Sequence, residues 1–519
     1  MNKRLTTSVY TFKDILDGNF LYIDKTKEIY DLIQNPKGMY FLSRPRRFGK
    51  SLMLSTFKSI FSGDKELFKG LYIYEQDYDW KKYPIINLNL GNISAHTAPD
   101  LERHLNYKID DIATLHKVEL KRDGAAEKFE ELINILSETD KVVILIDEYD
   151  KPILSNVLND NIHKIKETLK GFYSVIKTAE PHLRFSMMTG VSKFSKVSIF
   201  SELNNLDDLT MNTKYSTMLG FTQNEVESYF KERIAEIAEE RNKDQKELIA
   251  EIKEWYNGYR LSKKAITVYN PVSLTKFMMT GEFDNYWFET GTPTFLLELM
   301  RDKNYDIKSL EGLKLDAMAF SAYEVERLRV EPLLFQTGYA TIVDYNEEYD
   351  EYTLSYPNRE VKNAFLRYLV DYYTPMTKEL APQYLNELQR AILANDIDKF
   401  MKNLNVFFAN IDYDLHIANE KYYQTIFYLV FALLGVRIKT EIKTNKGRID
   451  AVIETDSHIY IFEFKLFDSA DSAIKQIKEK QYYRKYELSK KKIILVGVAF
   501  DKEMREMNDW KIIKNCENI

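Results

Sequence analysis

Residues 41–57 read FLSRPRRFGKSLMLSTF, an apolar run that enters a basic loop and leaves it as a helix-forming segment. Gly49 at the end of the loop lets the backbone approach a phosphate group, and the N-terminus of the helix points its N–H groups at the same place. Lys50 would then reach the β- and γ-phosphates of a nucleotide, and the Ser51 hydroxyl would bind Mg²⁺. The stretch therefore predicts a strand, a phosphate-binding loop (P-loop) and a helix.

The loop departs from the common P-loop pattern at one position, because Arg44 stands where that pattern has its first glycine. On its own, the Gly-Lys-Ser triplet could also mark a simple helix start. Arg46 and Arg47 share the loop with Arg44, and guanidinium groups pair well with phosphate oxygens. We interpret the three arginines as phosphate contacts; a solvated basic loop is the alternative.

A second run, KVVILIDE at residues 141–148, reads as a buried strand that ends in two carboxylates. In ATP-binding proteins with this arrangement, the first acid holds the Mg²⁺ shell and the second polarises the attacking water. We assign these roles to Asp147 and Glu148; an acidic turn is the alternative. A third run ends in Thr189, which could sense the γ-phosphate or simply end a strand. Together the motifs predict a site for ATP and Mg²⁺.

The pattern along the chain predicts an α/β protein. Four short apolar runs, at 39–43, 83–90, 141–146 and 183–189, alternate with longer helical stretches in the N-terminal part. This alternation is typical of a largely parallel sheet covered by helices. A charged helical stretch and a mixed stretch with a Tyr-rich hairpin or loop at 345–356 follow. The chain then returns to helix, strand, hairpin, helix and strand. The predicted segments are a P-loop domain at 1–215, a helical lid or winged-helix-like region at 216–300, a mixed, mainly helical region at 301–415 and an α/β domain at 416–519.

A carboxylate hairpin near the C-terminus carries the second chemical signal, GRIDAVIETDSHIYIFEFK at residues 447–465. A turn centred on Asp456 and Ser457 places Asp450 directly opposite Glu463, because paired positions then share one register. Two facing carboxylates repel each other unless a cation lies between them, and oxygen ligands suit Mg²⁺ or Mn²⁺. An exposed polar strand face, neutralised by neighbouring basic residues, is the alternative.

Lys465 lies on the same strand face as Glu463 and could position or deprotonate a water bound to that metal. The order Asp-x₁₂-Glu-x-Lys is the PD-(D/E)XK nuclease pattern. The preceding helix carries Glu420 as a further candidate metal ligand, and the following helix carries Gln476 and Tyr482 as candidate nucleic-acid contacts. A solvated acid, and surface or packing residues, are the respective alternatives.

Charge supports a nucleic-acid partner only locally. The whole chain has 73 basic and 79 acidic residues and a formal charge of −6, whereas residues 437–492 hold 14 basic and 9 acidic residues. A basic patch of this kind attracts the phosphate backbone, so DNA is the expected partner. The 519 residues contain one Cys, no apolar run near the length of a membrane span and no signal-peptide core, so we expect a cytoplasmic protein without a membrane partner.

Taken together, these segments resemble a bacterial and archaeal family with an AAA-ATPase-like N-terminal domain and a C-terminal PD-(D/E)XK nuclease domain. The resemblance runs over nearly the whole chain and includes the replaced P-loop glycine. The matching segments are LYIDKT (21–26), SRPRRFGKSL (43–52), LIDEYDKPIL (145–154), TGVSKFSKVSIFSELNNLDDLT (189–210), GFT (220–222), WYNGYR (255–260), YNPVSL (269–274), YWFETGTPTFL (286–296), LLFQTGY (333–339), YPNREVKNAF (356–365) and the hairpin.

The resemblance implies an AAA-like parallel sheet, a restriction-endonuclease-like C-terminal domain and the cofactors ATP and Mg²⁺ or Mn²⁺. It is compatible with a homo-oligomer and with a role in antiviral defence against foreign DNA. Residues 24–26 could approach the nucleotide or cap a helix. Lys193 and Arg260 could reach the γ-phosphate from a lid or a neighbouring subunit, or be solvated. The aromatic residues Trp255, Tyr256 and Trp287 are expected to be core residues.

Three functions follow from these motifs. The first is an ATP-regulated, Mg²⁺-dependent nuclease that acts on DNA. The second is a nucleotide-dependent signalling or scaffold protein whose C-terminal domain binds nucleic acid or a partner without cutting. The third, a motor that moves DNA to the nuclease, is less supported because the sequence shows no strand-separating element.

Overall fold

The computed structural model describes the chain in segments. The described residues are 3–157, 159–193, 206–287, 294–303, 305–320, 329–373, 380–409, 420–434, 437–444, 447–465, 468–500 and 507–514. The chain divides into two compact units. Unit 1 comprises Met1–Lys303 and Leu310–Lys362, and unit 2 comprises Asn304–Ser309 and Asn363–Ile519.

Unit 1 contains a parallel five-stranded sheet in the order β2-β3-β4-β1-β5. The sequence predicted its four main strands, and the structure confirms them. Strand β3 is buried along its whole length, as its unbroken apolar run requires. The strands are β1 (Gly38–Ser43), β2 (Ile85–Asn89), β3 (Val142–Asp147), β4 (Leu183–Gly190) and β5 (Asp207–Asp208).

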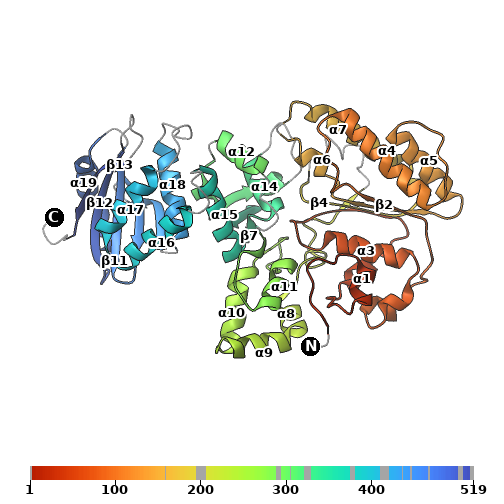
Figure 1. The fold of residues 1–519 in the computed structure, drawn as a ribbon, viewed down its shortest axis with the longest axis horizontal. Coiled ribbons are helices and arrows are strands. Elements are labelled where there is room, and N and C mark those ends of the chain that lie inside the picture. The colour runs from red at the N-terminus through yellow and green to blue at the C-terminus, as the bar shows by residue number, and fades with distance from the viewer. Residues whose placement is uncertain are drawn as a thin grey trace. The chain divides into compact units, whose positions relative to one another are not determined.

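Helices cover both faces of this sheet. Helices α4, α5 and α7 lie on one face, and α1 and α3 lie on the other (Figure 1). This layering buries the apolar stripe of each helix against the strands. The helices are α1 (Phe12–Asp17), α2 (Thr26–Ile33), α3 (Lys50–Phe61), α4 (Ala98–Leu115), α5 (Ala125–Ser137), α6 (Lys151–Leu154) and α7 (Ile162–Thr178).

The rest of unit 1 is a helical region followed by a small antiparallel sheet in the order β6-β8-β7. Strands β7 and β8 pair antiparallel, so of the two alternatives for the Tyr-rich stretch, a hairpin or a loop, the structure has the hairpin. The elements are α8 (Gln223–Tyr229), α9 (Lys231–Glu240), α10 (Gln245–Tyr256), α11 (Pro271–Thr280), α12 (Thr294–Asp302), β6 (Leu313–Asp316), α13 (Ala317–Phe320), α14 (Val330–Thr337), β7 (Thr341–Asn346) and β8 (Glu351–Ser355).

Unit 2 is built on a mixed five-stranded sheet in the order β13-β12-β11-β10-β9, in which only β11 and β12 are parallel. Helices α16, α17 and α18 lie on one face of this sheet and α19 lies on the other (Figure 1). The elements are α15 (Arg359–Tyr373, which begins in unit 1), α16 (Leu380–Leu393), α17 (Ile397–Ala409), α18 (Glu420–Leu433), β9 (Arg437–Thr444), β10 (Gly447–Glu454), β11 (His458–Lys465), α19 (Ala470–Glu479), β12 (Lys492–Phe500) and β13 (Met507–Ile513).

The unit boundary differs from the segment boundary that the sequence suggested at 416. Helices α16 and α17 both pack with the C-terminal elements. Gln389 of α16 donates to the Leu434 carbonyl at 3.0 Å, and two aromatic side chains of α17 meet rings of α18 and β12. Phe400 lies 5.1 Å from Phe431, and Phe408 lies 5.3 Å from Phe500, both measured between ring centroids. These contacts join residues far apart in sequence, so composition alone did not reveal them.

The start of α15 is held closely against the segment WYNGYR. Asn358 accepts a hydrogen bond from the Val361 N–H at 2.9 Å and donates one to the Asn257 carbonyl at 2.9 Å. Gly258 has a φ of +107°, and a Cβ there would lie 1.8 Å from the Pro357 carbonyl oxygen. The close approach of two backbones therefore requires glycine at this position.

We expect Gly258→Ala to lower the free energy of unfolding of unit 1 by at least about 2 kcal/mol, because it adds backbone strain and a clash with main-chain atoms. Urea unfolding followed by tryptophan fluorescence measures the change. The matched control is Gly171→Ala in α7, where a Cβ meets nothing within 4 Å. That change should stabilise the helix by about 0.5–1 kcal/mol, and equal effects of the two variants would contradict the close-packing argument.

Candidate functional site

The carboxyl ends of β1, β3 and β4 meet at one edge of the unit 1 sheet. The Ser51 hydroxyl, one residue into α3, donates to Asp147 Oδ2 at 2.5 Å. The Thr189 hydroxyl donates to Asp147 Oδ1 at 2.7 Å. Parallel strands bring these three predicted residues together, since their carboxyl ends lie on the same edge. The resulting group of hydroxyls around a carboxylate has the oxygen donors that Mg²⁺ prefers.

Lys50 lies with its ammonium group inside the loop. It is 7% exposed, and its Nζ donates to the carbonyl oxygens of Arg44 at 2.8 Å and Pro45 at 3.0 Å. Burial lowers the pKa of Lys50, and the carboxylate of Asp147 opposes that effect. Gly49 precedes it with a φ of +89°, the left-handed conformation that turns the chain into α3. Lys50 is thus placed to exchange two carbonyl partners for phosphate oxygens.

Glu148 directly follows the strand-end aspartate and lies half-buried, in a left-handed conformation with a φ of +52°. Burial raises the pKa of its carboxyl, and the positive charge of Lys50 opposes the rise. A Cβ on Gly91 would lie 2.6 Å from Glu148 Oε2, so a glycine leaves room for this side chain. A carboxylate in this setting can act as a base toward a water near the γ-phosphate.

The three arginines of the loop have different environments. Arg44 is 1% exposed, and its guanidinium donates to the carbonyl oxygens of Thr210 at 2.6 Å and Tyr215 at 3.2 Å. The interpretation of Arg44 as a phosphate contact is therefore wrong for this structure, because its side chain is buried and ties the loop to a distant segment. The long side chain occupies the place where the usual pattern has a glycine.

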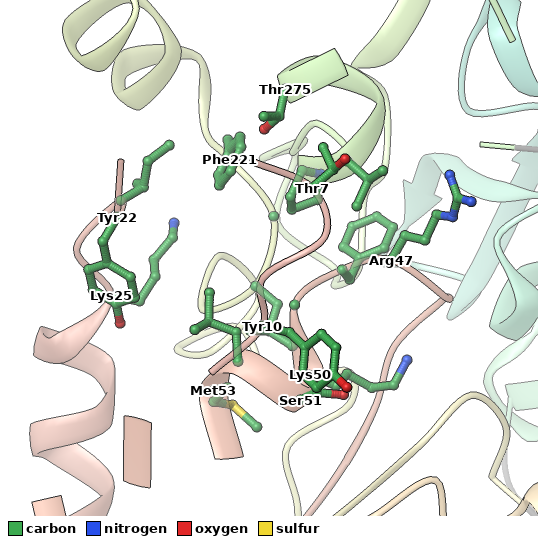
Figure 2. Close-up of a pocket in the computed structure, with 18 of the residues that line it drawn as sticks. Thr7, Tyr10, Tyr22, Lys25, Arg47, Lys50, Ser51, Met53, Phe221 and Thr275 are labelled. Carbon is green, nitrogen blue, oxygen red and sulfur yellow. The ribbon is translucent and has the colours of Figure 1, made fainter. Parts of the chain in front are cut away.

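Arg46 and Arg47 both line a cavity of about 550 Å³. Arg47 also donates from Nη1 to the Tyr286 carbonyl at 2.6 Å. Figure 2 shows Lys50 and Ser51 at one end of the pocket and Phe221 and Thr275 at the other. Its walls come from the N-terminal segment, the P-loop, residues 218–221 and α11.

The lining of this cavity combines two kinds of chemistry. The P-loop contributes backbone amides, Lys50 and two arginines, which suit phosphate groups. Other lining residues are apolar, such as Leu219, Phe221 and Pro271, and these suit the flat face of a base. The residues present therefore fit a nucleoside triphosphate.

The remaining candidates for nucleotide contact have other partners. Asp24 Oδ1 accepts at 2.8 Å from the N–H of Thr26, the first residue of α2, so this side chain holds the start of that helix. Lys193 forms an ion pair with Asp208, and Arg260 is 7% exposed with its guanidinium bonded to main-chain carbonyls. Tyr256 and Trp287 are buried, as expected, and Trp255 is partly buried.

Asp150 is a buried carboxylate that sequence reasoning did not single out. Its Oδ2 accepts from the N–H groups of Val191 at 3.0 Å and Ser192 at 2.6 Å, and from the Ser192 hydroxyl at 2.7 Å. Burial raises the pKa of Asp150, and these hydrogen bonds oppose the rise. It holds the segment after β4 next to the end of β3. The sequence offered only a third acid in DEYD as a signal.

In unit 2, β10 and β11 pair in the register that the turn predicted, with Ala451 opposite Phe462 and Glu454 opposite Ile459. Asp450, one residue before this ladder, accepts a hydrogen bond from the Phe464 N–H through its Oδ2 at 2.9 Å. Asp450 therefore lies beside Glu463.

Glu463 is only 2% exposed, and its Oε2 has no hydrogen-bond partner among the described residues. Burial, with the negative charge of Asp450, raises the pKa of Glu463 to about 8. Lys465 Nζ lies 3.4 Å from Glu463 Oε1 and opposes that rise. A divalent cation would satisfy the unpartnered oxygen and the facing carboxylates, so these residues fit a metal site.

Gln476 of α19 lies within this cluster. Its side-chain amide donates to Glu463 Oε1 and accepts from Lys465 Nζ at 2.5 Å. The close approach of α19 to the sheet depends on Gly497, where a Cβ would lie 2.4 Å from the Ala470 carbonyl oxygen. The amide therefore fixes the positions of both side chains.

Comparison with known proteins agrees with this arrangement. Residues 6–200 match the family described as Predicted AAA-ATPase, and residues 418–510 match the PD-(D/E)XK nuclease superfamily. A relative from Azotobacter chroococcum mcd 1, named "Uncharacterized protein in vnfD 5'region", is 38% identical over 524 residues, which cover 97% of this chain and 98% of the relative. This chain belongs to the AAA-ATPase-like family with a C-terminal PD-(D/E)XK nuclease domain.

A solved structure, that of the Aeropyrum pernix ORC2 protein in its ADPNP-ADP complexes, matches with a TM-score of 0.21 and 12% identity. The match covers 68% of this chain and 94% of that chain. Among the described residues of this AAA-ATPase-like protein, no helix has both the length and the apolar character that crossing a membrane would need.

Two predicted residues of the nuclease domain have other outcomes. Tyr482 is 2% exposed and packs in a core cluster with Ile459 and Ile477. This burial contradicts its interpretation as a nucleic-acid contact, because a ring inside the core does not face a ligand. Glu420 is the first residue of α18, and its side chain lies outside the described residues.

In the AAA-ATPase-like unit, we expect substitution of the buried Arg44 to affect stability and substitution of the cavity-lining Arg46 to affect ATP binding. Arg44→Met should lower the free energy of unfolding of unit 1 by more than about 2 kcal/mol, since it leaves buried carbonyls without donors. Arg46→Met should leave unfolding unchanged and weaken ATP binding about tenfold or more, because a charged contact is lost. Urea unfolding and ATP titration measure the two quantities, and the reverse pattern would contradict the assignment.

Proposed function

We propose that this protein is an ATP-binding switch coupled to a Mg²⁺- or Mn²⁺-dependent nuclease that cleaves DNA. The observation that carries the proposal is the unpartnered, buried Oε2 of Glu463 beside Asp450, with Lys465 held next to them by Gln476. Two facing acids in a buried position are costly unless they hold a cation. A module that only binds a partner has no need for such an arrangement.

For phosphodiester cleavage, Asp450 and Glu463 would hold the divalent metal, which supplies a positive charge for the scissile phosphate and lowers the pKa of water. Lys465, oriented by the amide of Gln476, would position the attacking water or take up its proton. The described residues offer two carboxylates here and no group of three or more His, Cys, Asp or Glu. This number of protein ligands suits Mg²⁺, which usually keeps several waters.

In the AAA-ATPase-like unit, Lys50 and the loop amides would bind the β- and γ-phosphates, and Arg46 and Arg47 would add charge. Ser51 and Asp147 would hold Mg²⁺. Glu148 would orient and deprotonate the attacking water, and the Thr189 hydroxyl would keep the Asp147 carboxylate in place. ATP would act as the switch that sets nuclease activity.

The proposal includes DNA as the substrate and the cytoplasm as the place of action. Clearance of foreign DNA is a role that suits a regulated nuclease, because an enzyme that cuts DNA must be held inactive until it is needed. A homo-oligomer is compatible with an AAA-like module.

We expect Asp450→Asn to reduce metal-dependent cleavage of plasmid and linear DNA by at least about 100-fold, because it removes a charged ligand of the metal. The assay uses Mg²⁺ or Mn²⁺, with and without ATP. The matched control is Asp456→Asn at the exposed turn of the same hairpin, which should retain activity within about twofold.

Absence of cleavage by the wild type under every condition, on DNA and RNA, would overturn the nuclease half of the proposal. The second function, a signalling or scaffold protein that binds without cutting, would then explain the C-terminal domain. A cellular effect that survives Lys465→Ala would lead to the same conclusion.

We expect Lys50→Ala to weaken ATP binding with and without Mg²⁺, because the ammonium would contact the phosphates directly. Asp147→Asn should instead lose only the gain in affinity that Mg²⁺ provides, since Asp147 would act through the metal. Titration with a fluorescent ATP analogue, with Mg²⁺ or with EDTA, separates the two effects. Wild-type affinity in Lys50→Ala would refute a nucleotide site at this loop.

A further inference from the structure

The side of the P-loop away from the sheet is held by residues of the middle region. The Arg46 carbonyl lies 3.5 Å from both Asn270 Nδ2 and Trp287 Nε1, which donate to it. The Tyr286 carbonyl accepts from Arg47 at 2.6 Å. Residues 286–287 therefore contact the P-loop through both arginines that line the nucleotide pocket.

The ring of Trp287 packs tightly in this place. It meets the ring of Tyr339 edge-on, with 5.0 Å between the centroids. A Cβ on Gly338 would lie 2.8 Å from the Pro45 side chain and 3.2 Å from the Trp287 ring. Pro45, Trp287 and the backbone at Gly338 thus form one close-packed contact, so a movement of the loop must displace the ring.

Glu360 continues this chain of contacts from the other side of Trp287. Its side chain is fully buried, and its Oε1 accepts from the Trp287 N–H at 2.7 Å. Burial raises the pKa of Glu360 to about 8, while the Trp287 N–H and the charge of Arg47 oppose the rise. Glu360 Oε2 has no hydrogen-bond partner among the described residues, and a buried polar atom in this state destabilises the fold.

Glu360 is also the second residue of α15, and this helix crosses the unit boundary. Residues up to Lys362 belong to unit 1, and the helix continues from Asn363 to Tyr373 as part of unit 2. An α-helix transmits a displacement of its first turn along its axis, because its backbone hydrogen bonds make it stiff. One covalently continuous element therefore leads from the P-loop contacts into the unit that carries the nuclease site.

We propose that the hydrogen bond between Glu360 and the Trp287 N–H couples nucleotide occupancy at the P-loop to α15, and through α15 to the nuclease unit. This inference rests on the proposed function and names the regulation of its two sites. Arg47 would move from the Tyr286 carbonyl toward the phosphates when ATP binds. The peptide at 286–287 would then shift, and Glu360 would pass the shift to the helix. Glu360 and Trp287 are positioning residues in this scheme.

Hydrogen exchange of the unit 2 part of α15, residues 363–373, tests the coupling in the full-length protein. It is measured without nucleotide and with a saturating non-hydrolysable ATP analogue and Mg²⁺. We expect the analogue to change exchange in this segment of the wild type. In Glu360→Ala the change should disappear although the analogue still binds with wild-type affinity, as titration would show. Glu360→Gln is the matched control, since it keeps an oxygen acceptor for Trp287 and should keep the change.

A second variant covers the case that Glu360→Ala fails to fold. Lys362→Gly combined with Asn363→Gly leaves the P-loop contacts intact and loosens the helix at the unit boundary. The nucleotide-dependent change should then persist in peptides that contain residues 286–287 and vanish beyond residue 363. A change that survives beyond the glycines would overturn the proposal.

Two further outcomes would also overturn it: an unchanged 363–373 segment in wild-type protein that binds the analogue, or a full response in Glu360→Ala. The titration and the cleavage assay separate this failure from failure of the proposed function. Without analogue binding, the switch itself is refuted and the coupling with it. If α15 responds while no DNA is cut, the coupling stands and only the nuclease assignment fails.

Discussion

The carboxylate of Asp147 is the point on which the nucleotide end of unit 1 depends. It accepts hydrogen bonds from Ser51, 96 residues earlier, and from Thr189, 42 residues later. Hydrogen bonds to a carboxylate are stronger than neutral ones, so this side chain links the ends of β3 and β4 to the first turn of α3. The parallel alignment of β1, β3 and β4 makes these contacts geometrically available.

The P-loop is also shaped by residues outside the sheet. Arg44 stands where the common P-loop pattern has a glycine, and its side chain donates to the carbonyls of Thr210 and Tyr215. These hydrogen bonds anchor the loop through a side chain that a glycine would lack. Phe48 packs edge-on against Tyr259, with 4.8 Å between the ring centroids. Several segments of the middle region that carry the family resemblance therefore have a physical role, because they contact the P-loop directly. Tyr259 contacts Phe48, and Asn270 and Trp287 donate to the Arg46 carbonyl.

Unit 2 holds acidic side chains at buried positions where neutral residues would give a more stable fold. Glu463 lies in the interior of the sheet next to Asp450, and burial alone disfavours its charged form. The absence of a side chain at Gly497 allows α19 to lie close enough for Gln476 to reach Glu463 and Lys465. The arrangement costs folding energy, and it fits the metal-dependent phosphodiester chemistry that we propose for this unit.

Local patterns determined much of this structure by themselves. The four apolar runs, the helix that opens at Lys50 and the register of the β10–β11 hairpin depend on residues close together in sequence, and the structure has them as predicted. Tertiary structure decided the rest, because the role of a residue depends on whether it is buried. Arg44 is buried and bonded to main-chain carbonyls, whereas Arg46 lines the cavity. Only the fold shows that Arg44 and Tyr482 are buried, that Asp150 holds the chain after β4, and that Glu360 meets Trp287. Such contacts join distant segments through packing, and no short stretch of sequence contains that information.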